Sequence, residues 1–550
     1  MIPDEADVVV VGSGAGGAPA ALELSVAGAR VVVLEKGRAA APEELVHDEL
    51  TMCRRDFFVP YVADEPHTLR SGEHETARPT ADGWTSNIVG GGTVHYSGFL
   101  YRMKPVDFRP RSVLGHVEGA ALADWPIDYH DLEPHYARAE LELGVSGRWR
   151  QHPFEEPRST DFPFPPLDEH PLAARIDEAA RALGLHPFST PRGILSRAHG
   201  DRGACLYCSV CGSFGCPAKA KASTSFSLLP RAIATGRCEV RARSMAIEVT
   251  VSRDGRVRGV VYLDEKGARR FIAARVVVLA CTAIETARLL LASRSSRFPD
   301  GLANGSRLVG RNLIFSGSGA GAALFRRRGR PWLERPCSPF VHRSIQDLYH
   351  PAAPVDGVRK AGTLQFLLGH ANPILNAERT LRAGGARPAW GQRLKDLLRE
   401  RAGTLTLEFE VFSEFLPTAG TYVDLDPTVK DRFGLPVARM TVARHPLDAR
   451  AAEVLIDRGM AILDALAPDE AERGGVGDTK FLQGGTCRFG ADPAASVLDR
   501  DCRAHEVPNL YVTDGSFLPS SGGVPLTLTI AANAFRVAAR VAERFRAGAL

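Results

Sequence analysis

A glycine-rich turn near the N-terminus is the first set of residues whose types and spacing could hold a reactive group. Gly12, Gly14 and Gly17 have the spacing G-x-G-x-x-G, and Glu35 follows in the next predicted strand. Gly12 permits a tight turn, Gly14 lets a pyrophosphate approach the backbone, and Gly17 allows close packing of helix on strand. The helix that follows offers unpaired N–H groups to phosphates, and Glu35 can accept hydrogen bonds from ribose hydroxyls. The pattern predicts a dinucleotide site but does not distinguish NAD from FAD.

Four cysteines form the second set that could do chemistry. They have the spacing C-x2-C-x2-C-x4-C-P, and thiolates at such spacing can converge on one iron–sulfur cluster, although the ferredoxin pattern is one residue shorter. A cluster would give electrons an exit to an acceptor other than oxygen. Four thiolates could also form a closed zinc site, and the third alternative is a cysteine-rich loop without metal. The cysteines are Cys205, Cys208, Cys211 and Cys216.

The strands and the helix that must position the glycine turn can be predicted from the residues on either side of it. Residues 8–11 are four valines, which suits a central parallel strand buried on both faces. Residues 18–26 have a helical pattern, and residues 29–34 form a second apolar run that leads into Glu35. This order of strand, turn, helix, strand and acid predicts a Rossmann-type α/β domain.

Length and composition narrow the class of protein. The chain has 550 residues, which exceeds the usual limit of about 250–300 residues for a single core, so we expect two domains. Its 68 basic and 64 acidic residues nearly cancel, which does not favour a nucleic-acid partner. No run reaches the about 18 apolar residues of a membrane-spanning helix, and no basic segment precedes the first apolar run. Ten cysteines are too few for a disulfide scaffold, so we expect a cytoplasmic protein.

Further motifs give the chain a family resemblance. A second glycine-rich loop occupies residues 87–99, and four more blocks follow at 125–129, 309–313, 425–431 and 509–516. In their order and content these blocks resemble the glucose–methanol–choline (GMC) oxidoreductases. The resemblance implies FAD rather than NAD, bound by a discontinuous Rossmann-type domain, with an α+β substrate domain built on an antiparallel sheet. The implied boundaries are 1–125, 201–315 and 485–550 for the FAD domain, and 126–200 and 316–484 for the substrate domain.

The resemblance also implies a role for particular residues beside the flavin. The second loop places Gly91, Gly92 and His95 against the flavin, and Asp514 and Gly515 match the segment that lies along it. His95 matches a position where some family members attach the flavin covalently; the alternative is a hydrogen-bonded histidine that lines the pocket.

Thr282 is a departure from the family pattern. The family usually has glycine at this position, and a side chain there could crowd the cofactor.

The C-terminal segment resembles the family's catalytic segment but lacks its polar residues. In the family a histidine precedes the threonine of a Gly-Thr motif by four residues and accepts the proton of the substrate hydroxyl. Gly485-Thr486 is present here, but the histidine position is Leu482. The second catalytic position, histidine or asparagine in the family, is Pro525. Neither side chain can accept a proton, so the usual acid–base pair is absent.

Three explanations for this loss lead to different functions. The protein could oxidise a substrate that needs no general base, or another histidine, His445 or His505, could replace the missing one. The flavin could also be mainly structural, in a protein that catalyses a non-redox cyclisation or isomerisation of a hydrophobic intermediate. We expect an FAD-dependent oxidoreductase acting on a small hydrophobic alcohol or related C–H donor, with the non-redox reaction as the alternative. The sequence does not identify the electron acceptor.

A predicted strand in the substrate region contains glutamates at alternating positions. Glu408, Glu410 and Glu414, within residues 405–416, are separated by two and then four residues. Even-numbered separations place side chains on the same face of a strand, so the pattern predicts one polar face. Paired carboxylates could do acid–base chemistry, but the simpler expectation is a strand face exposed to solvent.

Overall fold

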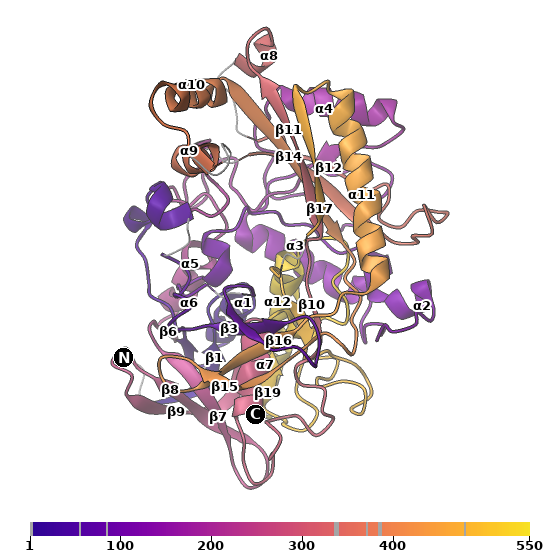
Figure 1. Cartoon of the computed structure of the whole chain (residues 1–550). Coiled ribbons are helices and arrows are strands. Elements are labelled where there is room, and N and C mark those ends of the chain that lie inside the picture. The colour runs from indigo at the N-terminus through magenta and orange to yellow at the C-terminus, as the bar shows by residue number, and fades with distance from the viewer. Residues whose placement is uncertain are drawn as a thin grey trace.

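The structure is a computed structural model that describes residues 4–53, 57–83, 86–334, 340–369, 372–382, 388–477 and 480–550. Its described strands form three sheets, and helices cover them (Figure 1). Both ends of the chain lie near the first of these sheets (Figure 1).

The first sheet, which we call the Rossmann-type sheet, has the strand order β6-β2-β1-β9-β8-β7, with β19 also paired to β9. The valines of residues 8–11 pair in parallel with residues 31–34 on one side and with 276–279 on the other. These strands are buried on both faces, which explains why their sequence is a continuous apolar run. The strands are β1 (Glu5–Val11), β2 (Val31–Leu34), β6 (Cys238–Arg241), β7 (Met245–Val251), β8 (Val257–Leu263), β9 (Arg269–Leu279) and β19 (Leu510–Val512).

Three long helices stack beside this sheet. Helix α1 (Gly17–Val26) lies on β1 and β2, α12 (Thr527–Arg546) lies against α1, and α3 (Tyr129–Leu143) lies against α12. Helix α12 follows directly after the loop that carries Pro525, so its packing fixes where that loop enters the site.

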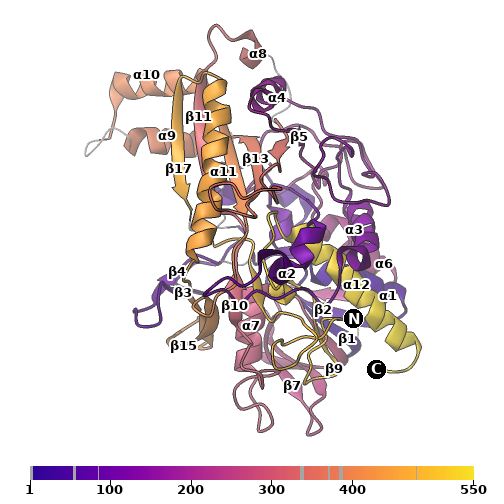
Figure 2. The same ribbon diagram turned by 90° about the vertical axis from the view of Figure 1, so that its right-hand side faces the viewer.

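The second sheet, which we call the roof sheet, is antiparallel with the order β17-β11-β14-β13-β12-β5. Helix α11 (Pro446–Ala465) lies along one of its faces (Figures 1 and 2). Side chains alternate between the two faces of a strand, so the residues of β14 that do not face α11 must face the interior of the molecule. The strands are β5 (Phe188–Ser189), β11 (Gly319–Arg326), β12 (Arg343–Ile345), β13 (Gly362–Leu368), β14 (Thr404–Ser413) and β17 (Glu470–Val476).

The third sheet joins distant segments of the chain in the order β18-β10-β15-β16-β3-β4. Its edge strand β18 contains the Gly-Thr motif and pairs with β10 through Arg311 and Thr486. This pairing brings the C-terminal catalytic segment under the roof sheet. The strands are β3 (His67–Arg70), β4 (Arg78–Thr80), β10 (Arg311–Ile314), β15 (Tyr422–Lys430), β16 (Pro436–Thr441) and β18 (Gly484–Thr486).

The remaining helices are shorter than α3, α11 and α12. None of the described helices is long and apolar enough to cross a membrane. They are α2 (Pro110–Leu114), α4 (Leu172–Ala182), α5 (Thr224–Ser227), α6 (Leu229–Ala234), α7 (Ala283–Ala292), α8 (Pro331–Glu334), α9 (Pro373–Arg382) and α10 (Gly391–Ala402).

The predicted fold class, a Rossmann-type α/β part with an antiparallel sheet beside it, is confirmed. All strands of the roof sheet lie within 126–200 and 316–484, the segments predicted for the substrate domain. The third sheet takes strands from both predicted domains, and α3 packs on the Rossmann-type side. The exact domain boundaries therefore stay a prediction.

Candidate active site

A cavity of about 890 Å³ lies between the Rossmann-type sheet and the roof sheet. It is the place where most of the predicted site residues meet, although they come from five separate parts of the chain. Those that line it are Gly12, Gly14, Glu35, Gly91, Gly92, His95, Leu482, Asp514, Gly515 and Pro525.

The glycine turn has the geometry that a pyrophosphate requires. Gly12 has φ +100°, and a Cβ atom on it would lie 2.2 Å from the carbonyl oxygen of Ala280. A Cβ on Gly17 would lie 2.0 Å from the carbonyl oxygen of Gly12, so the helix can approach the strand only with glycine there. A Cβ on Gly14 would lie 3.9 Å from the Gly90 carbonyl oxygen and from the Gly91 Cα, so the second glycine-rich loop packs against this residue.

Glu35 is held in place by the turn that it faces. Its carboxylate accepts hydrogen bonds from the Ser13 hydroxyl at 2.5 Å and from the Gly37 N–H at 2.8 Å. Burial raises the pKa of Glu35 above its ordinary value. The Ser13 hydroxyl in turn accepts a bond from the Gly90 N–H at 2.9 Å, so the two glycine-rich loops meet beside this carboxylate.

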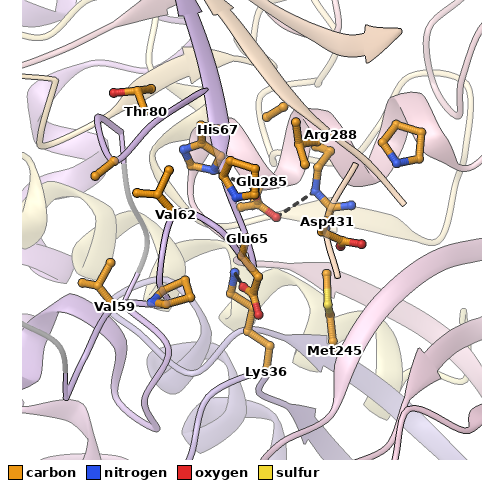
Figure 3. A pocket seen from close by; sticks show the side chains of 16 residues that line it. Lys36, Val59, Val62, Glu65, His67, Thr80, Met245, Glu285, Arg288 and Asp431 are labelled. Atoms are coloured by element: carbon orange, nitrogen blue, oxygen red, sulfur yellow. Dashed lines mark hydrogen bonds and ion pairs between the residues drawn. The ribbon is translucent and has the colours of Figure 1, made fainter. Parts of the chain in front are cut away.

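Charged side chains form a wall between the cavity and a small neighbouring pocket (Figure 3). Glu285 accepts hydrogen bonds from His67 at 3.0 Å and from Arg288 at 2.8 Å, while Lys36 donates to Glu65 at 3.2 Å. Burial opposes the charge of Glu285, but Arg288 and the bond from His67 lower its pKa well below the ordinary value. This wall separates the cavity from a small neighbouring pocket and presents fixed charges to both.

His95 is buried and lines the cavity from the second glycine loop. Its Nε2 lies 2.7 Å from the Ser86 hydroxyl, and its ring lies 4.6 Å from that of Phe58. The backbone carbonyl of His95 also accepts a bond from the Ser213 N–H at 2.8 Å. His95 therefore lines the cavity, and its predicted role, covalent attachment or hydrogen bonding, stays a prediction.

The segment opposite the glycine turn contains Asp514. Its carboxylate accepts hydrogen bonds from the Ser516 N–H at 2.8 Å and from the Thr286 hydroxyl at 2.5 Å, and burial raises its pKa. Thr282, at the position where the resemblance predicts a glycine, has φ +81° and lines the cavity. This left-handed conformation is one that glycine adopts without strain. The Thr282 hydroxyl has no hydrogen-bond partner among the described residues.

The two apolar replacements, Leu482 and Pro525, line the same cavity. Ser316 joins their segments, because its N–H donates to the Leu482 carbonyl at 3.2 Å and its hydroxyl donates to the Val524 carbonyl at 3.0 Å. The two positions are thus neighbours in space, as the resemblance implies, but neither supplies a group that exchanges protons.

The two histidines considered as substitutes lie elsewhere. His445 caps α11, where its Nδ1 accepts a bond from the Leu447 N–H at 3.2 Å and its Nε2 lies 2.9 Å from the Glu118 carbonyl oxygen. His505 pairs with the Ser496 hydroxyl at 3.0 Å. Neither is among the residues that line the cavity.

Two of the alternating glutamates line the cavity instead. Glu408 and Glu410 point into it from β14, whereas Leu407 and Phe409 belong to the core beneath α11. The expectation of a strand face exposed to solvent is therefore wrong. The alternation was the available signal, but only the position of α11 shows which face is interior.

Glu410 combines this position with a suitable proton affinity. Burial and then the neighbouring charge of Glu408 raise the pKa of Glu410 to about 7. Its Oε2 lies 3.4 Å from the amide nitrogen of Gln365 on the adjacent strand β13. A carboxylate with this pKa can take up a proton near neutral pH.

Glu414, the third of these glutamates, is buried in an ion-pair network that we call the loop clamp. Lys360 forms ion pairs with Asp107 at 2.8 Å and with Glu414. Glu414 accepts a bond from the Gly522 N–H at 3.1 Å, and Tyr349 connects Asp107 to the Gly523 N–H through bonds of 2.6 and 3.0 Å. The loop clamp ties the end of β14 to the loop that carries Pro525.

The cysteine loop lies beside the cavity, with Gly212 and Ser213 among the lining residues. All four of its cysteines are free thiols, and Cys208 is exposed. In the part of the chain that the structure describes, no three His, Cys, Asp or Glu side chains are placed to hold a metal ion.

Comparison of the sequence with known proteins shows the family to which the chain belongs. Family models for GMC oxidoreductases match residues 166–315 and 417–534, and a model for an FAD-binding domain matches residues 7–41. The chain belongs to the GMC oxidoreductase family. It is an FAD-dependent oxidoreductase, and the resemblance seen in the sequence is confirmed.

Two relatives and one solved structure illustrate the likeness. The chain is 31% identical to the 2-methyl-1,2-propanediol dehydrogenase of Mycolicibacterium austroafricanum, over 98% of this chain and 96% of that protein. It is 33% identical to the paromamine 6'-oxidase of Streptomyces fradiae, over 98% and 91%. The structure of formate oxidase from Aspergillus oryzae has the same fold, with a TM-score of 0.63 at 13% identity over 99% of both chains. None of these names supports the non-redox alternative.

Proposed function

We propose that this protein oxidises an alcohol to a carbonyl compound and that Glu410 accepts the hydroxyl proton. The bound FAD, held by the two glycine-rich loops and the segment around Asp514, supplies the hydride acceptor. The alcohol would lose one hydride from carbon and one proton from oxygen, which balances the two-electron oxidation. Glu410 replaces in this role the histidine that the family has at the position of Leu482.

The observation that supports this proposal is the position of a carboxylate with a raised pKa in the same cavity as Leu482 and Pro525. Glu410 lines that cavity and has a pKa of about 7, whereas the predicted substitutes His445 and His505 lie outside it. A general base works best when its pKa is close to the working pH.

The cavity wall supports a substrate with an apolar body. Several large apolar side chains surround the space between Glu410 and the flavin loops, which favours binding by burial of apolar surface. The relative named for a propanediol supports an alcohol as the reacting group. The apolar side chains are Phe99, Leu367, Phe412, Leu482, Leu526 and Ile530.

The compartment of the protein and the role of the cysteine loop are proposals. The cytoplasm is the compartment that we propose, on the basis of the cysteine content of the sequence. An iron–sulfur cluster is not part of the proposed function, because the described cysteines are not placed to hold one.

The test is the anaerobic reduction of the FAD-loaded enzyme by alcohols, followed as loss of flavin absorbance. Glu410→Gln should slow this reduction by about 10²–10⁴-fold at neutral pH, the usual contribution of a general base. Glu178→Gln, an exposed glutamate on α4, is the matched control and should leave the rate unchanged.

A Glu410→Gln variant that binds less FAD would be slow for that reason alone, so the pH dependence of the unaltered enzyme is measured as well. The rate of the unaltered enzyme should fall on the acid side of a midpoint near the pKa of Glu410, about 7. A rate that is independent of pH from 5 to 9, or a Glu410→Gln enzyme as fast as the control, would overturn the proposal.

A further inference from the structure

Arg192 has a buried guanidinium group without a polar partner. Its side chain forms no hydrogen bond or ion pair with the residues that the structure describes, and its Nε is buried and unpaired. The guanidinium carbon lies 4.2 Å from the ring centre of Phe99 and 4.8 Å from that of Phe340. Two aromatic rings hold the cation in place but satisfy none of its N–H donors. A buried charge left in this state is costly, so we expect a further group to complete its hydrogen bonds.

His342 supplies a second unpaired group at the same place. It is only 2% exposed, and neither Nδ1 nor Nε2 has a hydrogen-bond partner among the described residues. Its ring lies 4.4 Å from that of Phe340, the residue that also contacts Arg192. Burial lowers the pKa of His342 well below its ordinary value, so the ring is neutral and offers one N–H donor.

Arg192 and His342 line a small chamber of about 30 Å³. This volume holds about two water-sized atoms. Carboxylate side chains are absent from the described lining of the chamber; Glu410, whose pKa the charge of Arg192 lowers in part, lines the main cavity instead. The chamber adjoins the main cavity, because four residues line both spaces: Ser97, Phe99, Gly212 and Leu367.

We propose that this chamber receives a carboxylate group of the substrate. The planar guanidinium of Arg192 can donate two parallel hydrogen bonds to the two oxygens of a carboxylate, and the neutral His342 can donate a third. The chamber has room for about two oxygen-sized atoms beside the guanidinium. The apolar wall shared with the main cavity would then hold the body of the molecule.

This inference rests on the proposed function and narrows it to a substrate class. The substrate would be a hydroxy acid whose hydroxyl reacts in the main cavity and whose carboxylate is anchored at Arg192. The oxidation would turn it into an oxo acid, with the carboxylate unchanged.

Binding can be measured without turnover. The FAD-loaded enzyme is titrated with decanoate and with decanamide, which have the same apolar chain, and the change in the flavin absorbance spectrum reports binding. Decanoate should bind at least about tenfold more tightly than decanamide, because charge-assisted hydrogen bonds in a buried site are strong. Equal affinity for the two compounds would overturn the proposal.

The variant Arg192→Met tests the residue itself. It should abolish the preference for decanoate over decanamide, whereas Arg399→Gln, an exposed arginine on α10, should keep it. Arg192→Met should also leave the melting temperature unchanged or raise it, since it removes an unpaired buried charge. A lower melting temperature together with an unaltered preference for decanoate would mean that Arg192 serves only the fold.

Two further outcomes separate this inference from the proposed function. If neither ω-hydroxydecanoate nor decanol bleaches the flavin but decanoate still binds in an Arg192-dependent way, the proposed oxidation is wrong and the carboxylate site stands. If iron and sulfide copurify with the protein and are lost in Cys211→Ser, an anionic cluster is the counter-charge of Arg192, and the carboxylate proposal is overturned.

Discussion

Tyr101 donates a 2.6 Å hydrogen bond to Oε1 of Gln365, and this bond fixes which end of the Gln365 amide faces Glu410. With its oxygen held by Tyr101, Gln365 directs its NH₂ group to the Glu410 carboxylate at 3.4 Å. The Tyr101 hydroxyl is itself paired with Ser344 at 2.6 Å, and Ser344 with Thr190 at 2.6 Å. All of these groups except Glu410 are buried, so the orientation does not depend on solvent. Tyr101 and Gln365 are positioning residues for the proposed base.

Tyr101→Phe should raise the pKa of Glu410 further. Without the tyrosine hydroxyl, the Gln365 amide can turn and present its oxygen, which accepts a bond only from a protonated Glu410. The pH below which flavin reduction slows should therefore rise, while the rate at high pH should change little. The measurement is the pH dependence of anaerobic flavin reduction, with Tyr61→Phe, an exposed tyrosine, as control. An unshifted profile would show that the Gln365 orientation does not depend on Tyr101.

Glu408→Gln should move the same profile in the opposite direction. The charge of Glu408 is one of the causes that raise the pKa of Glu410 to about 7. Its removal lowers that pKa, and because Glu410 must be ionised to accept a proton, activity extends to lower pH. We expect the acid midpoint to fall by about 1 pH unit, a typical effect of one neighbouring like charge. A midpoint that rises or stays would mean that the two carboxylates do not interact in solution.

The cofactor side of the site could be predicted from the sequence because its signals are local. Gly12, Gly14 and Gly17 lie within six residues, so their spacing is visible in the sequence, although the backbone that a Cβ on Gly12 would meet belongs to Ala280. The Rossmann-type part of the fold followed from the same turn and the strands beside it, and the antiparallel sheet from the family resemblance. Leu482 and Pro525, the positions predicted for the missing acid–base pair, both line the cavity, and their having replaced catalytic residues stays a prediction.

The residues on the substrate side of the site could not be predicted, because their burial and contacts depend on segments that are far away in the sequence. The alternation around Glu410 shows a two-faced strand, but α11, which decides the buried face, lies tens of residues further along the chain. Arg192 is an isolated arginine in the sequence. Its unpaired state depends on Phe99 and Phe340, which no spacing pattern connects to it.

FAD should be bound without a covalent link to His95. The Nε2 of His95 already pairs with the Ser86 hydroxyl, and the ring packs on Phe58, so the side chain is held within the wall of the cavity. Acid precipitation of the purified protein should release the flavin into the supernatant. Flavin that stays in the pellet, and is released from His95→Ala, would show the covalent link instead.

Lys360→Met should destabilise the protein strongly through the loop clamp. Lys360 is 1% exposed and pairs with Asp107 and Glu414, which are 0% and 4% exposed. Removing the cation leaves two carboxylates buried without a counter-charge, and breaking a buried ion pair in this way costs about 3–5 kcal/mol. The measurement is the free energy of unfolding in urea, with the exposed Lys395→Met on α10 as the matched control.

The double substitution Lys360→Met with Glu414→Gln distinguishes the loop clamp from simple loss of packing. It removes one of the two stranded charges, so it should recover part of the stability lost in Lys360→Met alone. Glu414 also holds the Gly522 N–H at 3.1 Å, so both variants should loosen the loop that carries Pro525 and retain less FAD. If the double variant is less stable than the single one by the full cost of Glu414→Gln, the two residues act independently, and the loop is held by packing alone.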